Sequence, residues 1–286
     1  MLENIKDYIF PKTIEAAVRR MYQGAPGSSI PFTGSIDLVY PLMTQAETLL
    51  DISRLGLDQI TQKGHKIHIG GTASFQQIKE SSLLQDCLEG MISKAASLYA
   101  SRGQRNITNL QDTLISGTNY FDLLTVLVVL ESKIHLHGKT RRILLLEKAL
   151  KNGVGHGVGD EIVRELSFIK PRGRWKSSLQ RVAVLDSDLS ILSVAVMLKG
   201  NRKKCSEIRI AIGSGITHPS RFPDVEKYLA GKPLKAAVLK EAGSLISQAI
   251  EPLDDLRASD EYRREMAAVL LEKAVEDCLK KGDSTR

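Results

Sequence analysis

The order of apolar segments along the chain is the feature that most constrains its fold. Up to about residue 170, short apolar runs typical of strands alternate with segments of helical spacing, which predicts an α/β region. Beyond it, three apolar runs are followed by helical segments, which predicts an α+β region. The basic stretch from Lys170 to Arg174 carries Pro171 and Gly173 and separates the two patterns. The sequence therefore predicts two domains, residues 1–170 and residues 175–286.

Periodicity places strands and helices in the first region. Thr13 is in the position of an N-cap for a helix that begins at Ile14. Ile67 and Ile69 alternate with polar residues, which predicts a strand. We expect strands at residues 8–10, 30–32, 36–39, 49–52, 66–70, 133–136 and 161–169, helices at residues 72–78 and 83–100, and a dense apolar run at residues 123–130.

The second region has a simpler pattern. Three apolar runs predict strands, and the turn signal Lys199-Gly200-Asn201 is expected to join the second strand to the third. Longer segments with helical spacing follow them. We expect strands at residues 180–184, 191–198 and 207–212 and helices at residues 224–230, 234–250 and 261–280.

Composition excludes several classes of protein. The chain has 286 residues, of which 42% are apolar and 26% charged, a profile typical of soluble globular proteins. No stretch approaches the roughly 20 apolar residues that a membrane helix needs. The N-terminal segment carries Glu3, Lys6 and Asp7 and lacks the apolar core of a signal peptide. We therefore expect a cytoplasmic protein without a membrane span.

The spacing of the cysteines and the distribution of basic residues argue against a metal site built from cysteines and against nucleic-acid binding. Cys87, Cys205 and Cys278 lie far apart, so they form no disulfide framework and no CxxC pair for zinc or an iron–sulfur cluster. The net charge is +7, yet aromatic residues make up 5% of the chain and do not interleave with its basic runs. Stacking platforms for nucleic acids need such aromatics. A solvated surface or a docking patch for an acidic subunit is therefore favoured over nucleic-acid binding.

Other candidate sites are weak. His135 and His137 alternate on an expected strand and so share one face, but no carboxylate or cysteine partner is evident in the sequence. The glycine-rich segment 153–159 lacks the strand before it and the helix after it that give a phosphate loop its meaning, so a surface loop is favoured. No G-x-S-x-G or Cys/His nucleophile pattern occurs. We predict no catalytic residue and no metal ligand.

Short motifs distributed along the chain carry a family resemblance. The strongest is IEPLDDLRAS at residues 250–259, followed by Tyr262-Arg263, and others are IAIGSGITHPSR at 210–221, YIFPKTIEAA at 8–17, LDI at 50–52 and IHIGGT at 67–72. In this order they resemble the flavin subunits of the xanthine dehydrogenase and carbon monoxide dehydrogenase family of molybdenum hydroxylases. The resemblance extends from about residue 8 to residue 277. In the tail motif, Ser259 suits an N-cap, Arg257 can pair with a carboxylate and Tyr262 packs, so these residues are expected to be architectural.

The resemblance implies an α+β fold and a role in electron transfer. The implied architecture is a two-lobed α/β FAD-binding domain of the PCMH-like type, with lobes of about residues 1–55 and 56–170, followed by a C-terminal domain with a three-stranded antiparallel sheet and helices. The implied partners are a large molybdenum-cofactor subunit and a small two-iron two-sulfur subunit. FAD on this oxidoreductase subunit would pass electrons to NAD or a quinone.

The resemblance also implies where FAD binds. Two glycine-rich loops of the family hold its diphosphate, because glycine lets backbone N–H groups approach the phosphates. The family's A-G-G-T-D-L corresponds here to TGSIDL at residues 33–38, and its R-N-x-A-T-I-G-G-N corresponds to RNITNLQDT at residues 105–113. The expected cofactor-binding residues are Thr33, Gly34, Ser35, Ile36, Asp37, Asn109, Leu110, Gln111, Asp112, Thr113, Asp122, which stands at a family flavin-contacting Asp, and Arg181, which falls close to a family Lys.

The second loop departs from the family pattern, because Gln111-Asp112 replaces Gly-Gly. A carboxylate a few ångströms from the dianionic diphosphate costs on the order of 1–4 kcal/mol at intermediate dielectric. A loss of about 2–3 kcal/mol weakens binding roughly 30- to 150-fold. Two hypotheses therefore stay open: an FAD-binding electron carrier with an altered second loop, or a degenerate member that has lost or weakened FAD binding and acts as a non-catalytic scaffold.

Overall fold

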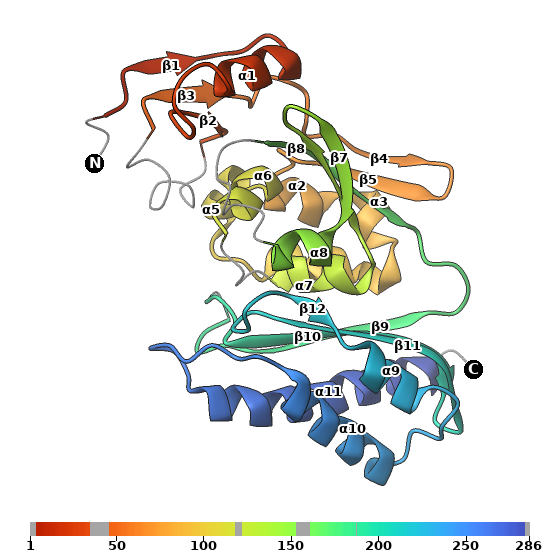
Figure 1. Cartoon of the computed structure of the whole chain (residues 1–286). Helices are drawn as coiled ribbons and strands as arrows, with labels where there is room; N and C mark the ends of the chain where they lie inside the picture. Colours follow the sequence, from red (N-terminus) through yellow and green to blue (C-terminus); the bar gives the residue numbers. More distant parts are fainter. Residues whose placement is uncertain (1–3, 35–45, 118–121, 153–160, 187, 284–286) are drawn as a thin grey trace. The chain divides into compact units, whose positions relative to one another are not determined.

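The computed structural model describes residues 4–34, 46–117, 122–152, 161–186 and 188–283 of the chain (Figure 1). The chain forms two compact units, and each is built from separate segments of the sequence. The first unit contains Met1–Leu83, Ser101–Thr118 and Ser132–Ile169, and the second contains Leu84–Ala100, Asn119–Glu131 and Lys170–Arg286. Two segments that precede residue 170 thus belong to the second unit. The expected domains, residues 1–170 and 175–286, stay a prediction.

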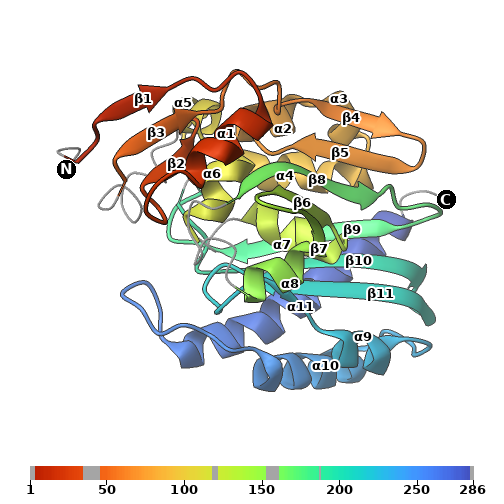
Figure 2. The same ribbon diagram turned by 45° about the horizontal axis from the view of Figure 1, so that its top comes forward.

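A small parallel sheet lies at the N-terminal end of the first unit (Figure 2). Its strands are β1 (Asp7–Ile9), β3 (Thr48–Asp51) and β2 (Ser29–Phe32), in that order. Helix α1 (Ile14–Met21) buries its apolar stripe against β3 and the residues that follow it. Thr13 caps this helix, since its hydroxyl accepts a hydrogen bond from the Ala16 N–H at 3.1 Å. The predicted N-cap is confirmed.

The first unit also contains an antiparallel five-stranded sheet. Its order is β4 (Ile60–Lys63), β5 (Lys66–Gly70), β8 (Ile162–Ile169), β6 (Lys133–His137) and β7 (Arg141–Leu145). Alternation along β5 and β6 buries one side of each strand, as the period of two requires. The strand expected at residues 36–39 lies outside the described residues. Besides α1, the helices that lie wholly in this unit are α2 (Phe75–Glu80), α5 (Arg102–Ile107), α6 (Leu110–Ile115) and α8 (Leu146–Lys151).

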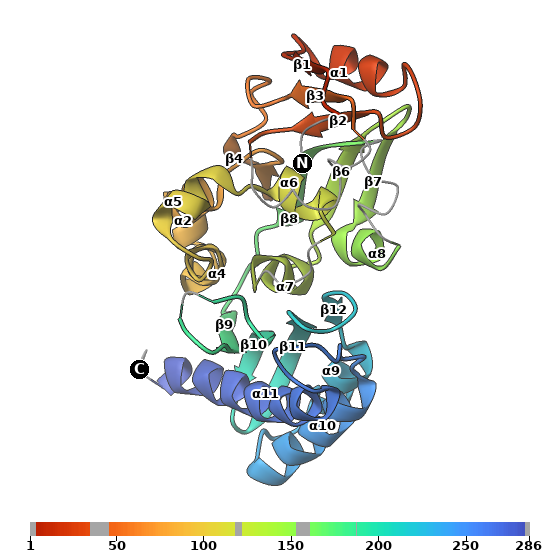
Figure 3. The same ribbon diagram turned by 90° about the vertical axis from the view of Figure 1, so that its left-hand side faces the viewer.

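The second unit is an antiparallel sheet with helices on both faces (Figure 3). The sheet order is β12 (Ser220–Arg221), β11 (Lys204–Gly213), β10 (Leu192–Asn201) and β9 (Lys176–Val182). Helices α4 (Met91–Ser97) and α7 (Asp122–Val129) pack on one face, and α10 (Ala236–Ala249) and α11 (Asp260–Asp283) lie on the other, beside α9 (Pro223–Leu229). The predicted α+β class is confirmed, with the two-residue β12 added to the three expected strands.

The single helix expected at residues 83–100 is wrong. The segment breaks into α3 (Ser82–Gln85), a short 3-10 turn (Leu88–Gly90) and α4. Leu88, Glu89 and Gly90 have φ values of 50°, 54° and 76°, which place them in the left-handed region. An α-helix cannot continue through such residues. The spacing of apolar residues predicted one continuous helix because α3 and α4, on either side of the break, both bury apolar side chains.

The turn expected at Lys199-Gly200-Asn201 is also wrong. These residues belong to β10, and the hairpin closes beyond them, where Asn201 pairs with Lys204. The pairing of β10 with β11 shifts register between Lys199 and Gly200. Gly200 has a φ of +125°, and a Cβ there would lie 2.3 Å from the Lys204 carbonyl oxygen. Gly200 therefore lies at a β-bulge inside the strand and not in a turn, since glycine also occurs at bulges within strands.

In the part of the chain that the structure describes, no helix combines the length and the apolar character needed to cross a membrane.

Candidate functional site

The first predicted loop begins where β2 ends. Thr33 and Gly34 follow the carboxyl end of this strand. Gly34 is exposed and has a φ of +97°, and a Cβ added to it would meet no atom within 4 Å. Open backbone in the left-handed region is the property that a phosphate-binding turn requires. Ser35, Ile36 and Asp37 lie outside the described residues.

The second predicted loop leads into α6. Asn109 is the N-cap of this helix, and its Oδ1 accepts a hydrogen bond from the Asp112 N–H at 3.0 Å. The Gln111 N–H donates to the Gly71 carbonyl at 2.6 Å, and the Thr113 N–H donates to the Asn109 carbonyl at 3.1 Å. These backbone donors are therefore already used inside the protein.

A carboxylate joins the two loops. Oδ2 of Asp112 accepts hydrogen bonds from the Thr33 hydroxyl and, at 3.0 Å, from the Asn109 amide. The same amide donates to Thr33 Oγ1 at 2.5 Å. Asp112 is fully buried, and Asn109 is 3% exposed. We call these residues the Thr33–Asn109–Asp112 cluster. The structure thus brings together residues of the two loops that are predicted to hold the diphosphate.

The other side chains of the second loop point into the protein. Oε1 of Gln111 accepts a hydrogen bond from the Val163 N–H of β8 at 2.5 Å. Among the described residues, Gln111 Nε2 and Thr113 Oγ1 are buried without a hydrogen-bond partner. Leu110 is fully buried. Gln111 therefore supports β8 in the position where the family has a glycine.

The residues present fit FAD at the first loop and oppose it at the second. Thr33 supplies a hydroxyl, and Gly34 supplies open backbone. Phosphate groups are bound by free N–H and hydroxyl donors. In the second loop, the backbone N–H groups of Gln111 and Asp112 donate to protein oxygens, and a carboxylate takes the hydrogen bonds of Thr33 and Asn109.

Asp122 and Arg181 meet in the second unit. Asp122 begins α7, and its Oδ2 lies 3.4 Å from Nη1 of Arg181 on β9. Ser190 donates to Asp122 at 2.8 Å, and Ser214 donates to it at 3.3 Å. Burial raises the pKa of Asp122, against the opposing effects of the Ser190 hydrogen bond and the Arg181 charge. The sequence analysis named both residues separately and did not predict that they form an ion pair.

Two family models match the chain. The model described as the FAD binding domain in molybdopterin dehydrogenase matches residues 3–164, which is more than half of the chain. The chain belongs to this family. A second model, the CO dehydrogenase flavoprotein C-terminal domain, matches residues 178–278. The resemblance predicted from the motifs is confirmed: this family member carries the FAD-binding domain of an oxidoreductase family, and FAD is the cofactor of that domain.

Relatives of this family member have a similar length. It is 25% identical over 255 residues to the glyceraldehyde dehydrogenase medium chain of Sulfolobus acidocaldarius, covering 86% of this chain and 89% of the relative. It is 23% identical over 279 residues to the carbon monoxide dehydrogenase medium chain of Hydrogenophaga pseudoflava, covering 94% and 95%. A crystal structure of a Cu,Mo-CO dehydrogenase has a chain that matches with a TM-score of 0.88 at 23% identity, covering 96% of this chain and 98% of that one. The fold is therefore that of a molybdenum hydroxylase flavoprotein.

The first unit also contains a histidine cluster that the sequence did not predict. Oε1 of Glu165 on β8 lies 2.9 Å from Nδ1 of His68 on β5 and 3.6 Å from Nδ1 of His135 on β6. Glu165 is thus a carboxylate partner of His135 that the sequence alone does not reveal, because it comes from a neighbouring strand whose register only the structure shows. Burial lowers the pKa of His135, and Glu165 opposes this effect. Among the described residues, no group of His, Cys, Asp and Glu could hold a metal ion.

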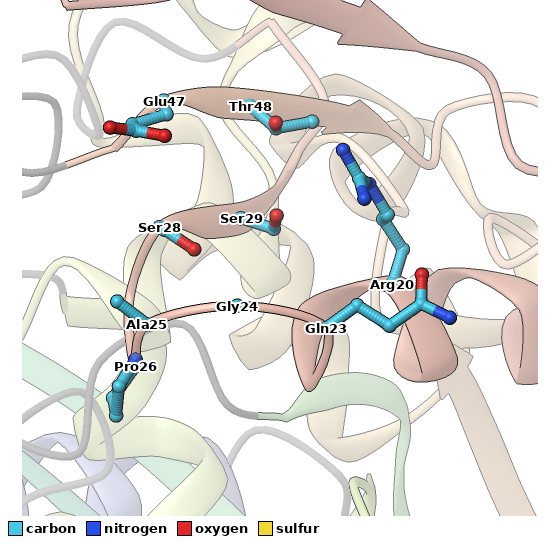
Figure 4. A pocket seen from close by; sticks show the side chains of 9 residues that line it. All are labelled: Arg20, Gln23, Gly24, Ala25, Pro26, Ser28, Ser29, Glu47 and Thr48. Carbon is cyan, nitrogen blue, oxygen red and sulfur yellow. The ribbon is translucent and has the colours of Figure 1, made fainter.

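A pocket of about 350 Å³ lies in the first unit beside the amino ends of β2 and β3 (Figure 4). Arg20 extends toward Thr48 of β3, and Ser28 and Ser29 line the side formed by β2 and the residue before it. The first predicted loop follows the opposite end of β2. No expected cofactor-binding residue is among the described residues that line this pocket.

Proposed function

We propose that this chain is the FAD-binding, electron-transfer subunit of a molybdenum hydroxylase complex of the xanthine, aldehyde or CO dehydrogenase type. The observation that carries the proposal is the order of its two matched domains, at residues 3–164 and 178–278. Relatives named as medium chains of glyceraldehyde and carbon monoxide dehydrogenases are matched over most of their length. FAD, when bound, supplies the redox chemistry, and the protein positions it.

The partners in this proposal are a large molybdenum-cofactor subunit and a small two-iron two-sulfur subunit. Electrons would pass from the iron–sulfur subunit through FAD to NAD or a quinone. The cysteines support a separate iron–sulfur subunit, since Cys87, Cys205 and Cys278 are all buried and far apart in the sequence. Iron–sulfur clusters of this type need four ligands close together. The proposal includes a cytoplasmic location, which the three scattered and unpaired cysteines support.

The first loop has the clearest part in cofactor binding. The Thr33 hydroxyl and the Gly34 backbone are placed at the carboxyl end of β2, where a parallel sheet presents ligands. Ser35, Ile36 and Asp37 continue this loop in the proposal. For residues 109–113, Asp122 and Arg181, contact with FAD stays a prediction.

A second candidate function is a non-catalytic scaffold that keeps the fold and has lost or weakened FAD binding. The Thr33–Asn109–Asp112 cluster favours it, because a carboxylate and committed backbone donors stand where the family has Gly-Gly. In this role the chain would hold the other subunits together without carrying electrons.

Purification of the tagged chain from its own cells separates the two functions. If the chain is the electron-transfer subunit, the purified complex contains molybdenum, iron and a large and a small subunit, and it shows flavin absorbance when FAD is supplied. A complex with both metals that takes up no FAD from an excess would establish the scaffold. Recovery of the chain without either subunit would contradict the proposed partners. The metal content, the subunit composition and the visible spectrum are measured on the same sample.

A further inference from the structure

We infer that the Asp112 carboxylate is a built-in competitor for the diphosphate of FAD, which makes FAD an exchangeable ligand of this chain. The inference rests on the proposed function, because it concerns the ligand of the same domain. It adds a property that neither the family models nor the relatives assign: a carboxyl group of the protein itself already occupies the position between the two loops.

The carboxylate has the contacts that a bound anion would have. Oδ2 of Asp112 accepts hydrogen bonds from one hydroxyl, on Thr33, and from one amide, on Asn109. These two side chains come from the loops that the family uses on the diphosphate. The carboxyl group and these two donors therefore form a hydrogen-bonded cluster that links the two loops.

The surroundings keep the carboxylate in this place. Asp112 is fully buried, and its own N–H is held by Asn109 Oδ1 at 3.0 Å. Gln111 beside it is fixed at both ends, through its N–H to Gly71 and through its Oε1 to Val163. A diphosphate that enters must displace Asp112 from both donors, or lie without them next to a like charge. Either course weakens phosphate binding.

The competition is specific for phosphate. FAD and ADP share the diphosphate, whereas riboflavin has none, so the Asp112 charge opposes the first two ligands and leaves the third unaffected. Asp112→Asn removes the charge and keeps the size and one acceptor oxygen. Asp112→Gly restores the residue that the family has in this position. Asp112→Gly also frees the Thr33 hydroxyl for a phosphate oxygen, whereas Asp112→Asn keeps an acceptor for that hydroxyl.

The test is a titration of the full chain with FAD, ADP and riboflavin, followed by calorimetry and flavin fluorescence. We expect Asp112→Asn and Asp112→Gly to bind FAD and ADP about 30-fold more tightly than the wild type, which corresponds to about 2 kcal/mol, with riboflavin affinity unchanged. The matched control is Glu15→Gln, which removes an exposed carboxylate from the first turn of α1 in the same unit. It should leave all three affinities as in the wild type.

The outcomes separate the inference from the proposed function. Tight FAD binding by the wild type, with no gain or a loss in both Asp112 variants, overturns the competitor and leaves the electron carrier standing. An equal gain for riboflavin also overturns it, because the effect is then not on the diphosphate. If no variant binds FAD or ADP although circular dichroism shows native secondary structure, both the inference and the electron carrier are wrong. Tighter binding of FAD and ADP alone supports both.

Discussion

Arg263 fixes the start of α11 in the second unit, and its removal should cost much of the stability of that unit. Its side chain is 0% exposed. Nη2 donates to Asp255 Oδ1 at 2.7 Å, Nε donates to the Ile191 carbonyl at 3.3 Å, and Nη1 donates to the Leu253 carbonyl. Arg263→Met keeps much of the volume and removes every donor. The Asp255 carboxylate then loses one of its two arginine partners, and the Ile191 and Leu253 carbonyl groups lose the hydrogen bonds from this side chain.

The magnitude follows from the surroundings of the pair. Removing one partner of a buried ion pair costs about 3–5 kcal/mol. Asp255 keeps a second ion pair, with Arg257 at 2.9 Å, and 27% of its side chain is exposed. Both features reduce the stability that is lost, so we expect the free energy of unfolding to fall by about 3 kcal/mol, the lower end of the range. Folded domains have free energies of unfolding of about 5–15 kcal/mol, so the variant remains folded but is clearly weakened.

Urea unfolding followed by circular dichroism at pH 7 measures this loss. The matched control is Arg202→Met, since Arg202 forms an ion pair with Glu276 of the same helix at 2.6 Å but is 54% exposed. We expect the control to lose less than about 1 kcal/mol. If Arg263→Met loses no more than the control, the account of Arg263 as a buried anchor is refuted.

The pH dependence provides an independent check on the same pair. Burial alone raises the pKa of Asp255, but hydrogen bonds from Arg257 and Arg263 outweigh it and hold the pKa well below its usual range. The pKa of Asp255 in the folded protein lies below the unfolded value of about 3.9. The ionised Asp255 carboxylate therefore stabilises the folded protein fully above that pH. This stabilisation is lost as the pH falls through the folded pKa. The difference between the wild type and Arg263→Met should therefore shrink below about pH 4.

Three smaller predictions follow from local contacts. Gly213→Ala would place a Cβ 2.1 Å from Thr125 Oγ1, so we expect about 1–3 kcal/mol of destabilisation in thermal unfolding, and an unchanged melting temperature would contradict the packing. Thr13→Ala removes the N-cap of α1 and should cost about 1 kcal/mol in urea unfolding, whereas Thr13→Ser should cost much less. Burial raises the pKa of the Cys278 thiol to about 12, so this cysteine should react with a thiol reagent after unfolding in urea and not before.

Much of the fold could be predicted from local patterns. The Thr13 N-cap, β5 at Lys66–Gly70 and α9 to α11 follow periodicity and capping closely, because those signals act within one turn or one strand. Strand β7 (Arg141–Leu145) was missed. It is an edge strand with exposed residues and therefore shows no alternation of buried and polar positions. The break at Leu88–Gly90 was missed because two ordinary residues there adopt the left-handed conformation that sequence signals assign to glycine.

The candidate site was predicted in part. The motif at residues 105–113 led to the second loop, and the charge of Asp112 was already expected to oppose a diphosphate. The sequence could not show where that charge goes, since Thr33 and Asp112 are separated by 79 positions and meet only in the folded first unit. The pairing of Asp122 with Arg181 could not be predicted from the sequence for the same reason, since these residues are also far apart in the chain. Arg257 was expected to pair with a carboxylate, and its contact with Asp255 confirms this.

Flavin retention by the purified chain shows whether Asp112 weakens the binding of FAD. Wild type and Asp112→Gly are incubated with excess FAD, passed through a desalting column and examined by visible spectroscopy. We expect the wild type to take up FAD and to lose most of it on the column, whereas Asp112→Gly should keep flavin absorbance in proportion to protein. Retention by the wild type that equals or exceeds that of the variant, or the absence of uptake by both, would contradict this expectation.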